Sequence, residues 1–266
     1  MDYIDQLENN SIYLIREAYS RFKKVALLWS MGKDSTTLLW LCRKAFFGQI
    51  PFPVVHIDTS YKFQQIYEFR EKYAREWNLN LTVLKNEDAL KEGMNYSKGR
   101  FECCNTLKTE TLKMGIKKHH FEALFLAIRR DEHGIRAKER FFSPRDTDMR
   151  WDYQNQPPEL WDLYQSSLSN DKHFRIHPML NWREIDVWQY IQKEKMPVID
   201  LYFSKNQKRY RSIGCETCCF ATPSGAKSLR EIISELKTTR VSERSGRAQD
   251  KEDTFAMQKL RSLGYM

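Results

Sequence analysis

The chain has 266 residues, of which 41% are hydrophobic and 13% aromatic, and this supplies enough apolar surface for one sizeable core. Ten Gly and eight Pro are too few for a fibrous chain, and the aromatic content excludes disorder throughout. A net charge of +9 favours anionic partners such as nucleotides, oxyanions or DNA, although a solvated surface of mixed sign explains the same count. No apolar run approaches the roughly 20 residues of a membrane span, and the acidic start is unlike a signal peptide, so we expect a cytoplasmic protein without membrane contact.

Apolar runs alternate with helical patterns along the first half of the chain. An amphipathic pattern over the first twenty-odd residues predicts a helix. Apolar runs predict two buried strands, at 25–29 and 53–58, and two further strands at 79–84 and 121–128. Helices are expected between them at 36–47, 63–77 and 106–118. This alternation indicates an α/β fold with a doubly wound, mostly parallel sheet. Ligands of such sheets bind outside the carboxyl ends of the strands, where 30–35, Asp58 and 129–132 fall.

The second half of the chain is less regular. Residues 140–175 are polar and aromatic without sustained periodicity, so we expect a lid or an insertion there. A capped helix is expected at 181–191. We therefore expect a main domain over residues 1–200 and a C-terminal extension over 201–266, which carries two helices and three of the six cysteines.

A polar turn, Ser30-Met-Gly-Lys-Asp-Ser35, joins the first buried strand to the helix that follows it. Backbone N–H groups in such a turn, backed by a helix N-terminus, bind anions. Gly32 allows phosphate to approach closely, Lys33 adds a positive charge, and Ser35 can cap the helix and bond an oxygen. The turn is not a Walker A loop, because Asp34 follows the lysine where that motif needs Ser or Thr.

The turn resembles the pyrophosphate loop (SxGKDS) of the adenine-nucleotide α-hydrolase superfamily, whose members cleave ATP between its α- and β-phosphates. Further segments recur in the order of that family: His56-Ile-Asp-Thr59, Arg129-Arg-Asp-Glu132, Arg136-Ala-Lys-Glu-Arg140, 178–190 and 239–247. Over nearly the whole length the chain resembles the small subunits of sulfate adenylyltransferase and, more distantly, the PAPS and APS reductases. The resemblance implies an ATP pyrophosphatase of the adenylyltransferase type.

The resemblance also implies site residues. The loop residues would hold the β- and γ-phosphates of ATP: Ser30, Gly32, Lys33, Asp34 and Ser35. Asp58 and Thr59 would lie near the nucleotide, and Arg129 and Arg130 near the α-phosphate or the acceptor oxyanion. In-line displacement at phosphorus needs charge neutralisation more than a covalent nucleophile, so Lys33, Asp34 and these two arginines are the expected catalytic residues. Mg²⁺ bridging the phosphates is implied, with Asp34 or Asp58 as its carboxylate.

Cysteines form a second set of candidate site residues. Disulfides are not expected in a cytoplasmic chain, and Cys42 falls on the apolar face of a helix. Cys103 and Cys104 followed at a distance by Cys215-Glu-Thr-Cys218 resemble the ligands of the four-iron (4Fe–4S) cluster of APS reductases. Cys218 is preferred to its neighbour because it completes Cys-x-x-Cys. Adjacent thiolates fit such a cluster more easily than one tetrahedral zinc, but zinc and unliganded redox thiols stay open.

Three functional interpretations remain once reduction is set aside. The related reductases end in a tail with a catalytic Glu-Cys-Gly, whereas no cysteine follows Cys219, so reduction is disfavoured. An adenylylating core with the cysteine quartet resembles the ATP pyrophosphatases of bacterial DNA phosphorothioation (the DndC and SspD type). Our main interpretation is therefore activation of a DNA backbone phosphate, with a cysteine desulfurase as partner. The DNA would be guided by Arg129, Arg130 and the basic residues at 205–211 and 240–247, Arg209 and Arg211 among them.

Two alternatives remain beside the DNA interpretation. The first is a sulfate adenylyltransferase small subunit that makes adenylyl sulfate with a GTPase large subunit. The second is a non-catalytic nucleotide- or redox-sensing module, and the intact Lys33 and Asp34 argue against it. A homo-oligomer is compatible with all three interpretations.

Overall fold

The structure is a computed structural model that describes residues 2–165, 173–248 and 256–265. Its α-helices are α1 (Tyr3–Arg21), α2 (Lys33–Ala45), α3 (Gln64–Glu76), α4 (Glu87–Lys91), α5 (Arg100–Cys104), α6 (Thr111–His119), α7 (Glu184–Glu194), α8 (Leu229–Thr238) and α10 (Ala256–Ser262). Its strands are β1 (Val25–Leu28), β2 (Val54–Ile57), β3 (Leu81–Leu84), β4 (Ala123–Phe125), β5 (Phe142–Arg145), β6 (His173–Ile176), β7 (Lys208–Arg209) and β8 (Thr222–Pro223). Short 3-10 turns include η4 (Asp200–Tyr202), η5 (Glu216–Cys218) and η6 (Glu243–Gly246).

Six strands form the central sheet in the order β3-β2-β1-β4-β6-β5. All neighbouring pairs are parallel except β5 with β6. The chain leaves β1 toward β2 and β3 on one side and later returns to place β4 on the other side. The predicted doubly wound, mostly parallel α/β fold is therefore confirmed, and its topological switch point lies between β1 and β4.

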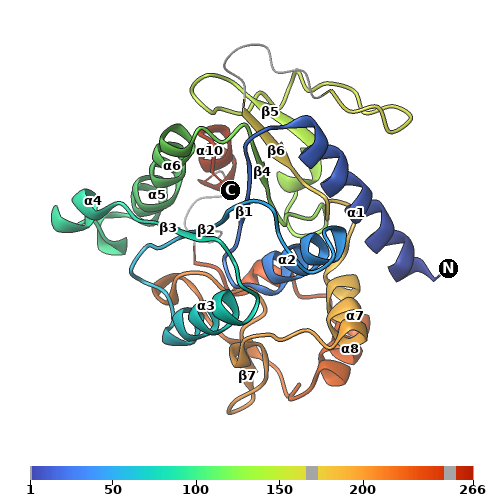
Figure 1. Cartoon of the computed structure of the whole chain (residues 1–266). Coiled ribbons are helices and arrows are strands. Elements are labelled where there is room, and N and C mark those ends of the chain that lie inside the picture. Colours follow the sequence, from blue (N-terminus) through green and yellow to red (C-terminus); the bar gives the residue numbers. More distant parts are fainter. Residues whose placement is uncertain (1, 166–172, 249–255, 266) are drawn as a thin grey trace.

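Helices cover both faces of the sheet (Figure 1). Side chains of β1 alternate between two cores: Leu27 belongs to the core under α1, α2, α3 and α7, and Leu28 to the core under α6. Helix α1 joins the larger core through buried residues spaced three or four apart, Ile15 among them, and the Asp2 carboxylate caps its first turn. Both faces of β1 are therefore buried, as its continuous apolar run predicts.

The irregular second half of the chain contains more structure than its pattern indicates. Strands β5 and β6 occupy the two ends of the segment 140–175, for which the sequence predicts no strand. Their sequences hide them, because Pro144 and Arg175 interrupt any apolar run. An edge strand tolerates such a proline, since it needs hydrogen bonds on one side only. The lid function expected for this segment stays a prediction.

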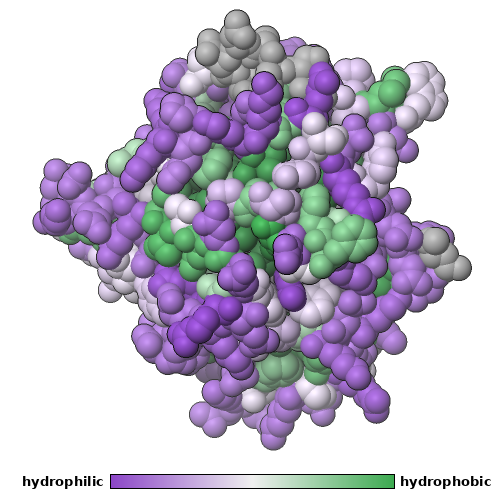
Figure 2. Space-filling model, in the orientation of Figure 1, coloured by the Kyte–Doolittle hydropathy of each residue, from purple (hydrophilic) through white to green (hydrophobic). Residues whose placement is uncertain are grey.

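The surface is hydrophilic over most of the face drawn in Figure 2, with apolar residues gathered near its middle, in the region of β1, β2 and β3. Within the described residues, no helix combines the length and apolar character needed to cross a bilayer.

Candidate active site

The loop between β1 and α2 has the form of an anion-binding turn. The hydroxyl of Ser35 accepts a hydrogen bond from the Ser30 N–H at 3.1 Å and lies 3.0 Å from the Ser30 hydroxyl. Met31 adopts a left-handed backbone (φ 61°), which turns the chain sharply into the helix. A Cβ on Gly32 would stand 3.5 Å from the Tyr202 hydroxyl, and that hydroxyl accepts from the Lys33 N–H at 2.8 Å. Tyr202 of η4 thus fixes the start of α2.

A cavity lies at the carboxyl ends of β1, β2 and β4, where the sequence predicts the site. The loop 30–35 forms one wall. The C-terminal extension forms another wall, through Tyr202, 212–214, Arg244, Arg247 and Tyr265. The site is therefore assembled from the carboxyl edge of the sheet and from the C-terminal extension, which is distant from that edge in sequence.

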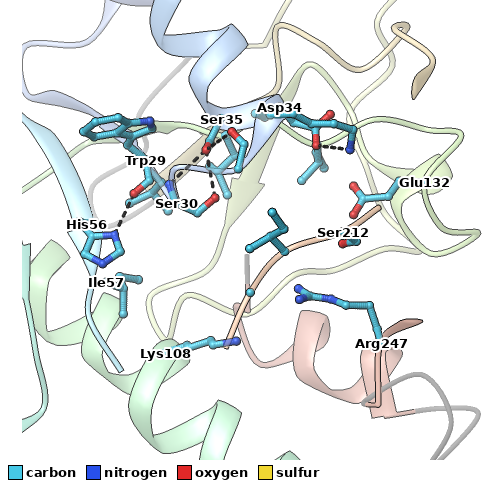
Figure 3. Close-up of a pocket in the computed structure, with 18 of the residues that line it drawn as sticks. Trp29, Ser30, Asp34, Ser35, His56, Ile57, Lys108, Glu132, Ser212 and Arg247 are labelled. Carbon is cyan, nitrogen blue, oxygen red and sulfur yellow. Dashed lines mark hydrogen bonds and ion pairs between the residues drawn. The ribbon is translucent and has the colours of Figure 1, made fainter. Parts of the chain in front are cut away.

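Positive side chains face the loop across the cavity. In Figure 3, Lys108 and Arg247 point inward from the side opposite to Ser30 and Ser35. Lys108 is buried, and its ammonium donates to the Tyr265 hydroxyl at 3.3 Å. Within residues 2–165, 173–248 and 256–265, neither Lys62 nor Lys108 forms an ion pair with a carboxylate. This end of the cavity can therefore attract an anion.

The residues expected to hold phosphate lie in different places. Lys33 and Asp34 both line the cavity. Arg129 is fully buried behind the loop, where it donates to Asp34, Glu243 and, at 2.9 Å, Asp131. The contact of Arg129 with a nucleotide stays a prediction.

Arg130 points away from this cavity. Its guanidinium donates to Asn181 and lies 5.2 Å from the ring centroid of Phe141, beside a separate surface depression. The structure thus separates two arginines that are adjacent in sequence. A direct role of Arg130 at the phosphates remains a prediction that this geometry does not favour.

Asp58 and Thr59 end β2 as expected, but they face different surroundings. The Asp58 carboxylate accepts from Ser60 N–H at 2.8 Å and from the Tyr67 hydroxyl at 2.9 Å, and these bonds lower its pKa although burial opposes them. Thr59 Oγ1 lies 3.1 Å from Cys215 Sγ. Of the two carboxylates considered for Mg²⁺, Asp34 lines the cavity and Asp58 lies outside it.

Two acidic side chains at the site escaped the sequence analysis as individual residues. Glu132 lines the cavity and accepts from Arg136 and, at 3.3 Å, from Arg244. These arginines lower the pKa of Glu132 against the opposing effect of burial. Glu243 pairs with Lys33 and Arg129. Both glutamates lie in segments that carry the family resemblance, and this was the available signal.

The structure gathers the four predicted cysteines without arranging them as metal ligands. Burial, then the proximity of Cys104, Cys215 and Cys218, raises the pKa of Cys103 to about 12. Burial also opposes ionisation of Cys215, but Lys108 and Lys62 lower its pKa to about 6. Among the described residues, no three His, Cys, Asp or Glu side chains are grouped as a metal site requires. The thiols as placed do not fit a metal ion.

Two other cysteines have ordinary environments. Cys42 is fully buried in the core on α2, as predicted. Cys219 Sγ accepts from Gly214 N–H at 3.1 Å and from Arg247 at 2.6 Å. Gly214 leaves the room for this contact, since a Cβ there would stand 2.2 Å from the guanidinium.

The expectation that Arg209 and Arg211 form an exposed DNA-guiding patch is wrong. Arg209 is buried and donates to Glu235 at 2.7 Å, and Arg211 is buried and donates to Glu184 at 2.5 Å. A carboxylate therefore neutralises each guanidinium inside the protein. The sequence pattern does not reveal these pairs, because each carboxylate lies on a helix distant in sequence, Glu184 on α7 and Glu235 on α8.

An anion-binding loop at the topological switch point of a doubly wound sheet is typical of nucleotide-binding α/β proteins. The model of the phosphoadenosine phosphosulfate reductase domain matches residues 24–221, so the chain belongs to that family. In an alignment 300 positions long, the chain is 39% identical to sulfate adenylyltransferase subunit 2 of Pseudomonas savastanoi pv. phaseolicola, covering 100% of this chain and 98% of that protein. The same protein of Stutzerimonas stutzeri is also 39% identical with the same coverage.

Solved structures share the fold at low sequence identity. Candida glabrata FMN adenylyltransferase in complex with ATP matches with a TM-score of 0.59 at 17% identity, over 83% of this chain and 64% of that one. Phosphoadenylyl-sulfate reductase from Candida auris matches with a TM-score of 0.54 at 18% identity, over 82% of this chain and 97% of that one. The chain thus has the fold of adenine-nucleotide α-hydrolase-like proteins.

Proposed function

We propose that the chain is the adenylylating subunit of a sulfate adenylyltransferase, which transfers AMP from ATP to sulfate and releases pyrophosphate. The observation that carries the proposal is one cavity with the anion-binding loop on one side and Lys108 and Arg247 on the opposite side (Figure 3). Lys62, a neighbour of these two side chains, also lines it. Relatives that match over 98% of their own length bear the name sulfate adenylyltransferase subunit 2, which supports sulfate as acceptor and a larger subunit as partner. A GTPase partner is part of the proposal.

The two ends of the cavity bind different reactants in the proposed reaction. The loop N–H groups and the hydroxyls of Ser30 and Ser35 hold the β- and γ-phosphates. Asp34 would hold Mg²⁺, which would supply positive charge to the phosphates. Lys108 and its cationic neighbours hold sulfate. A sulfate oxygen attacks the α-phosphorus while the bond from that phosphorus to the bridging oxygen breaks. Sulfate is already an anion, so positioning and charge neutralisation suffice and no general base is needed.

The DNA interpretation is weaker on present observations. Two arginines that would guide DNA, Arg209 and Arg211, are buried in ion pairs. The relatives described above bear names that refer to sulfate, and none of these names refers to DNA or to a cysteine desulfurase. We therefore place sulfate before a DNA phosphate as the acceptor.

The iron–sulfur cluster is not needed for adenylyl transfer. It stays a prediction for Cys103, Cys104, Cys215 and Cys218, which are near one another although they are not grouped as a metal site requires. No step of the proposed reaction involves it.

Product analysis tests the proposal. The chain with its large subunit, ATP, Mg²⁺ and sulfate should yield adenylyl sulfate and pyrophosphate, with inorganic pyrophosphatase added to draw the reaction forward. Lys33→Ala should abolish product formation while the circular dichroism spectrum stays that of the native fold. Release of ADP and orthophosphate would contradict the proposal, because it places the cleavage at the γ-phosphate.

A further inference from the structure

Four charged side chains form a closed ring behind the anion-binding loop. Lys33 Nζ donates to Asp34 Oδ2 at 2.9 Å, and Asp34 Oδ1 accepts from Arg129. Glu243 closes the ring, since one carboxylate oxygen accepts from Arg129 and the other from Lys33. Positive and negative groups therefore alternate around it, and three separate parts of the chain supply them.

Burial makes each member of this ring depend on the others. The Lys33 side chain is 1% exposed and that of Arg129 is 0% exposed, whereas the Asp34 side chain is 19% exposed and lines the cavity. Removing one partner of a buried ion pair leaves an uncompensated charge and is strongly unfavourable. Without Glu243, both cations would turn to Asp34, the one carboxylate that they share inside the ring. The change would thus reach a side chain that faces the nucleotide cavity.

Contacts outside the ring hold Glu243 in place. Its neighbour Arg244 donates to Glu132 at 3.3 Å, and the carbonyl of Gly246 accepts from Phe220 N–H at 2.9 Å. Arg247 donates to Cys219 Sγ at 2.6 Å. These bonds attach η6 to two different parts of the site, so the segment presents its carboxylate at a defined position.

We propose that Glu243 is a positioning residue for the anion-binding loop. It lies outside the cavity lining and acts through Lys33 and Asp34, which it holds in one arrangement for the phosphates. The proposal rests on nucleotide binding by this loop and deepens the proposed function, but it does not depend on sulfate as acceptor. The C-terminal extension is then part of the phosphate site, although Glu243 lies 210 residues beyond the loop lysine.

The test compares Glu243→Gln, Glu243→Ala and Glu243→Asp with the native chain in its complex. Gln keeps the shape and removes the charge, and Asp keeps the charge on a shorter stem. We expect Gln and Ala to weaken binding of inorganic pyrophosphate and of ATP, measured by calorimetry with Mg²⁺, by tenfold or more. The KM for ATP should rise with them, and Asp should recover part of the loss.

Glu235→Gln is the matched control. It breaks another Arg–Glu pair of the C-terminal extension, with Arg209 at 2.7 Å, and neither of those residues lines the cavity. A merely structural role of Glu243 would lower the folded fraction and hence kcat, while Kd and KM of the folded protein stayed native. Native pyrophosphate affinity in Glu243→Gln, or an equal loss in Glu235→Gln, would overturn the proposal. Pyrophosphate binding keeps this outcome separate from any failure to make adenylyl sulfate.

Discussion

At the residue scale, the chemistry depends on which buried cations have a carboxylate partner inside the protein and which do not. Arg129, Arg209 and Arg211 are each neutralised by carboxylates inside the protein. The Lys108 ammonium instead donates to the Tyr265 hydroxyl at 3.3 Å and lies 5.7 Å from the centroid of the Tyr265 ring. Lys108 also lines the cavity. Among the described residues no carboxylate pairs with Lys108, whose charge acts instead on the Cys215 thiol, so an anion in the cavity would add a counter-charge that no carboxylate supplies.

Lys108→Gln should therefore weaken the acceptor site selectively. A hydrogen bond to a charged group contributes about 1.5–3 kcal/mol, so the KM for sulfate should rise by about tenfold or more, and the KM for ATP much less. Initial-rate kinetics with each substrate varied in turn measure both. Lys91→Gln is the control, because the Lys91 side chain is 74% exposed on α4. A larger change in the KM for ATP than for sulfate would refute this assignment.

At the element scale, the C-terminal extension is built into the site rather than appended to it. It supplies a wall of the cavity, with Tyr202 bonded to the start of α2 and Glu243 of η6 paired with Lys33 of the loop. Residues 218–220 and 246–248 lie against each other, since Phe220 N–H donates to Gly246 O at 2.9 Å and Ala248 N–H to Cys218 O at 3.1 Å. This pairing carries Glu243 and Arg247 to the site.

Gly246→Ala should push the segments 218–220 and 246–248 apart. A Cβ at Gly246 would stand 2.4 Å from the Phe220 carbonyl oxygen, which is backbone and cannot swing aside. Overpacking of this kind costs about 1–3 kcal/mol, so urea unfolding should show a comparable loss of stability. Gly134→Ala is the control, because a Cβ there meets nothing within 4 Å. Equal stabilities of the two variants would contradict the close packing.

Cys103 and Cys104 end α5, Cys215 caps η5 and Cys218 ends it, and the metal content of this quartet can be measured. If the quartet holds a 4Fe–4S cluster, anaerobically purified protein should contain about four irons and lose them when Cys103 or Cys215 becomes Ser. Cys42→Ala should keep the metal, since that residue lies in the core. Stoichiometric zinc, or protein free of metal after anaerobic handling, would rule the cluster out.

At the scale of the whole molecule, the sheet determines where the site lies and the charges determine how the fold responds to pH. Three histidines, His56, His173 and His177, are buried, and burial lowers the pKa of each; for His56 and His177 it falls to about 3. These side chains are neutral in the folded protein and titrate near pH 6.5 in the unfolded chain. Below about pH 6.5 the unfolded state therefore binds more protons, and stability falls as the pH falls.

This acid sensitivity should be visible between pH 6.5 and 4.5. Each buried histidine contributes about 1.4 kcal/mol per pH unit in that window. His173→Asn removes one titrating group, so the dependence of the unfolding free energy on pH should drop by about a third of the histidine contribution. Urea unfolding at several pH values measures the slope, which is separate from any overall loss of stability. An unchanged slope would show that His173 does not titrate differently in the two states.

The sequence alone predicts what local patterns encode. Strands β1 to β4 and the loop 30–35 are each local in sequence, so their positions could be predicted, as could the meeting of the loop with the ends of β1, β2 and β4. Pairings between distant segments could not be. Glu243 with Lys33, and Arg209 with Glu235, depend on how the C-terminal extension folds back. A lone glutamate or arginine in a charged stretch gives the same sequence pattern whether its side chain is solvated or buried in an ion pair.

Transfer of the adenylyl group to sulfate is tested most directly with sulfate labelled by heavy oxygen. The chain and its large subunit react with ATP and Mg²⁺, and mass spectrometry follows the products. The bond forms between a sulfate oxygen and the α-phosphorus, so adenylyl sulfate should retain all of the label and pyrophosphate should carry none. AMP and pyrophosphate formed at the same rate without sulfate, with no labelled adenylyl sulfate, would contradict sulfate as the acceptor.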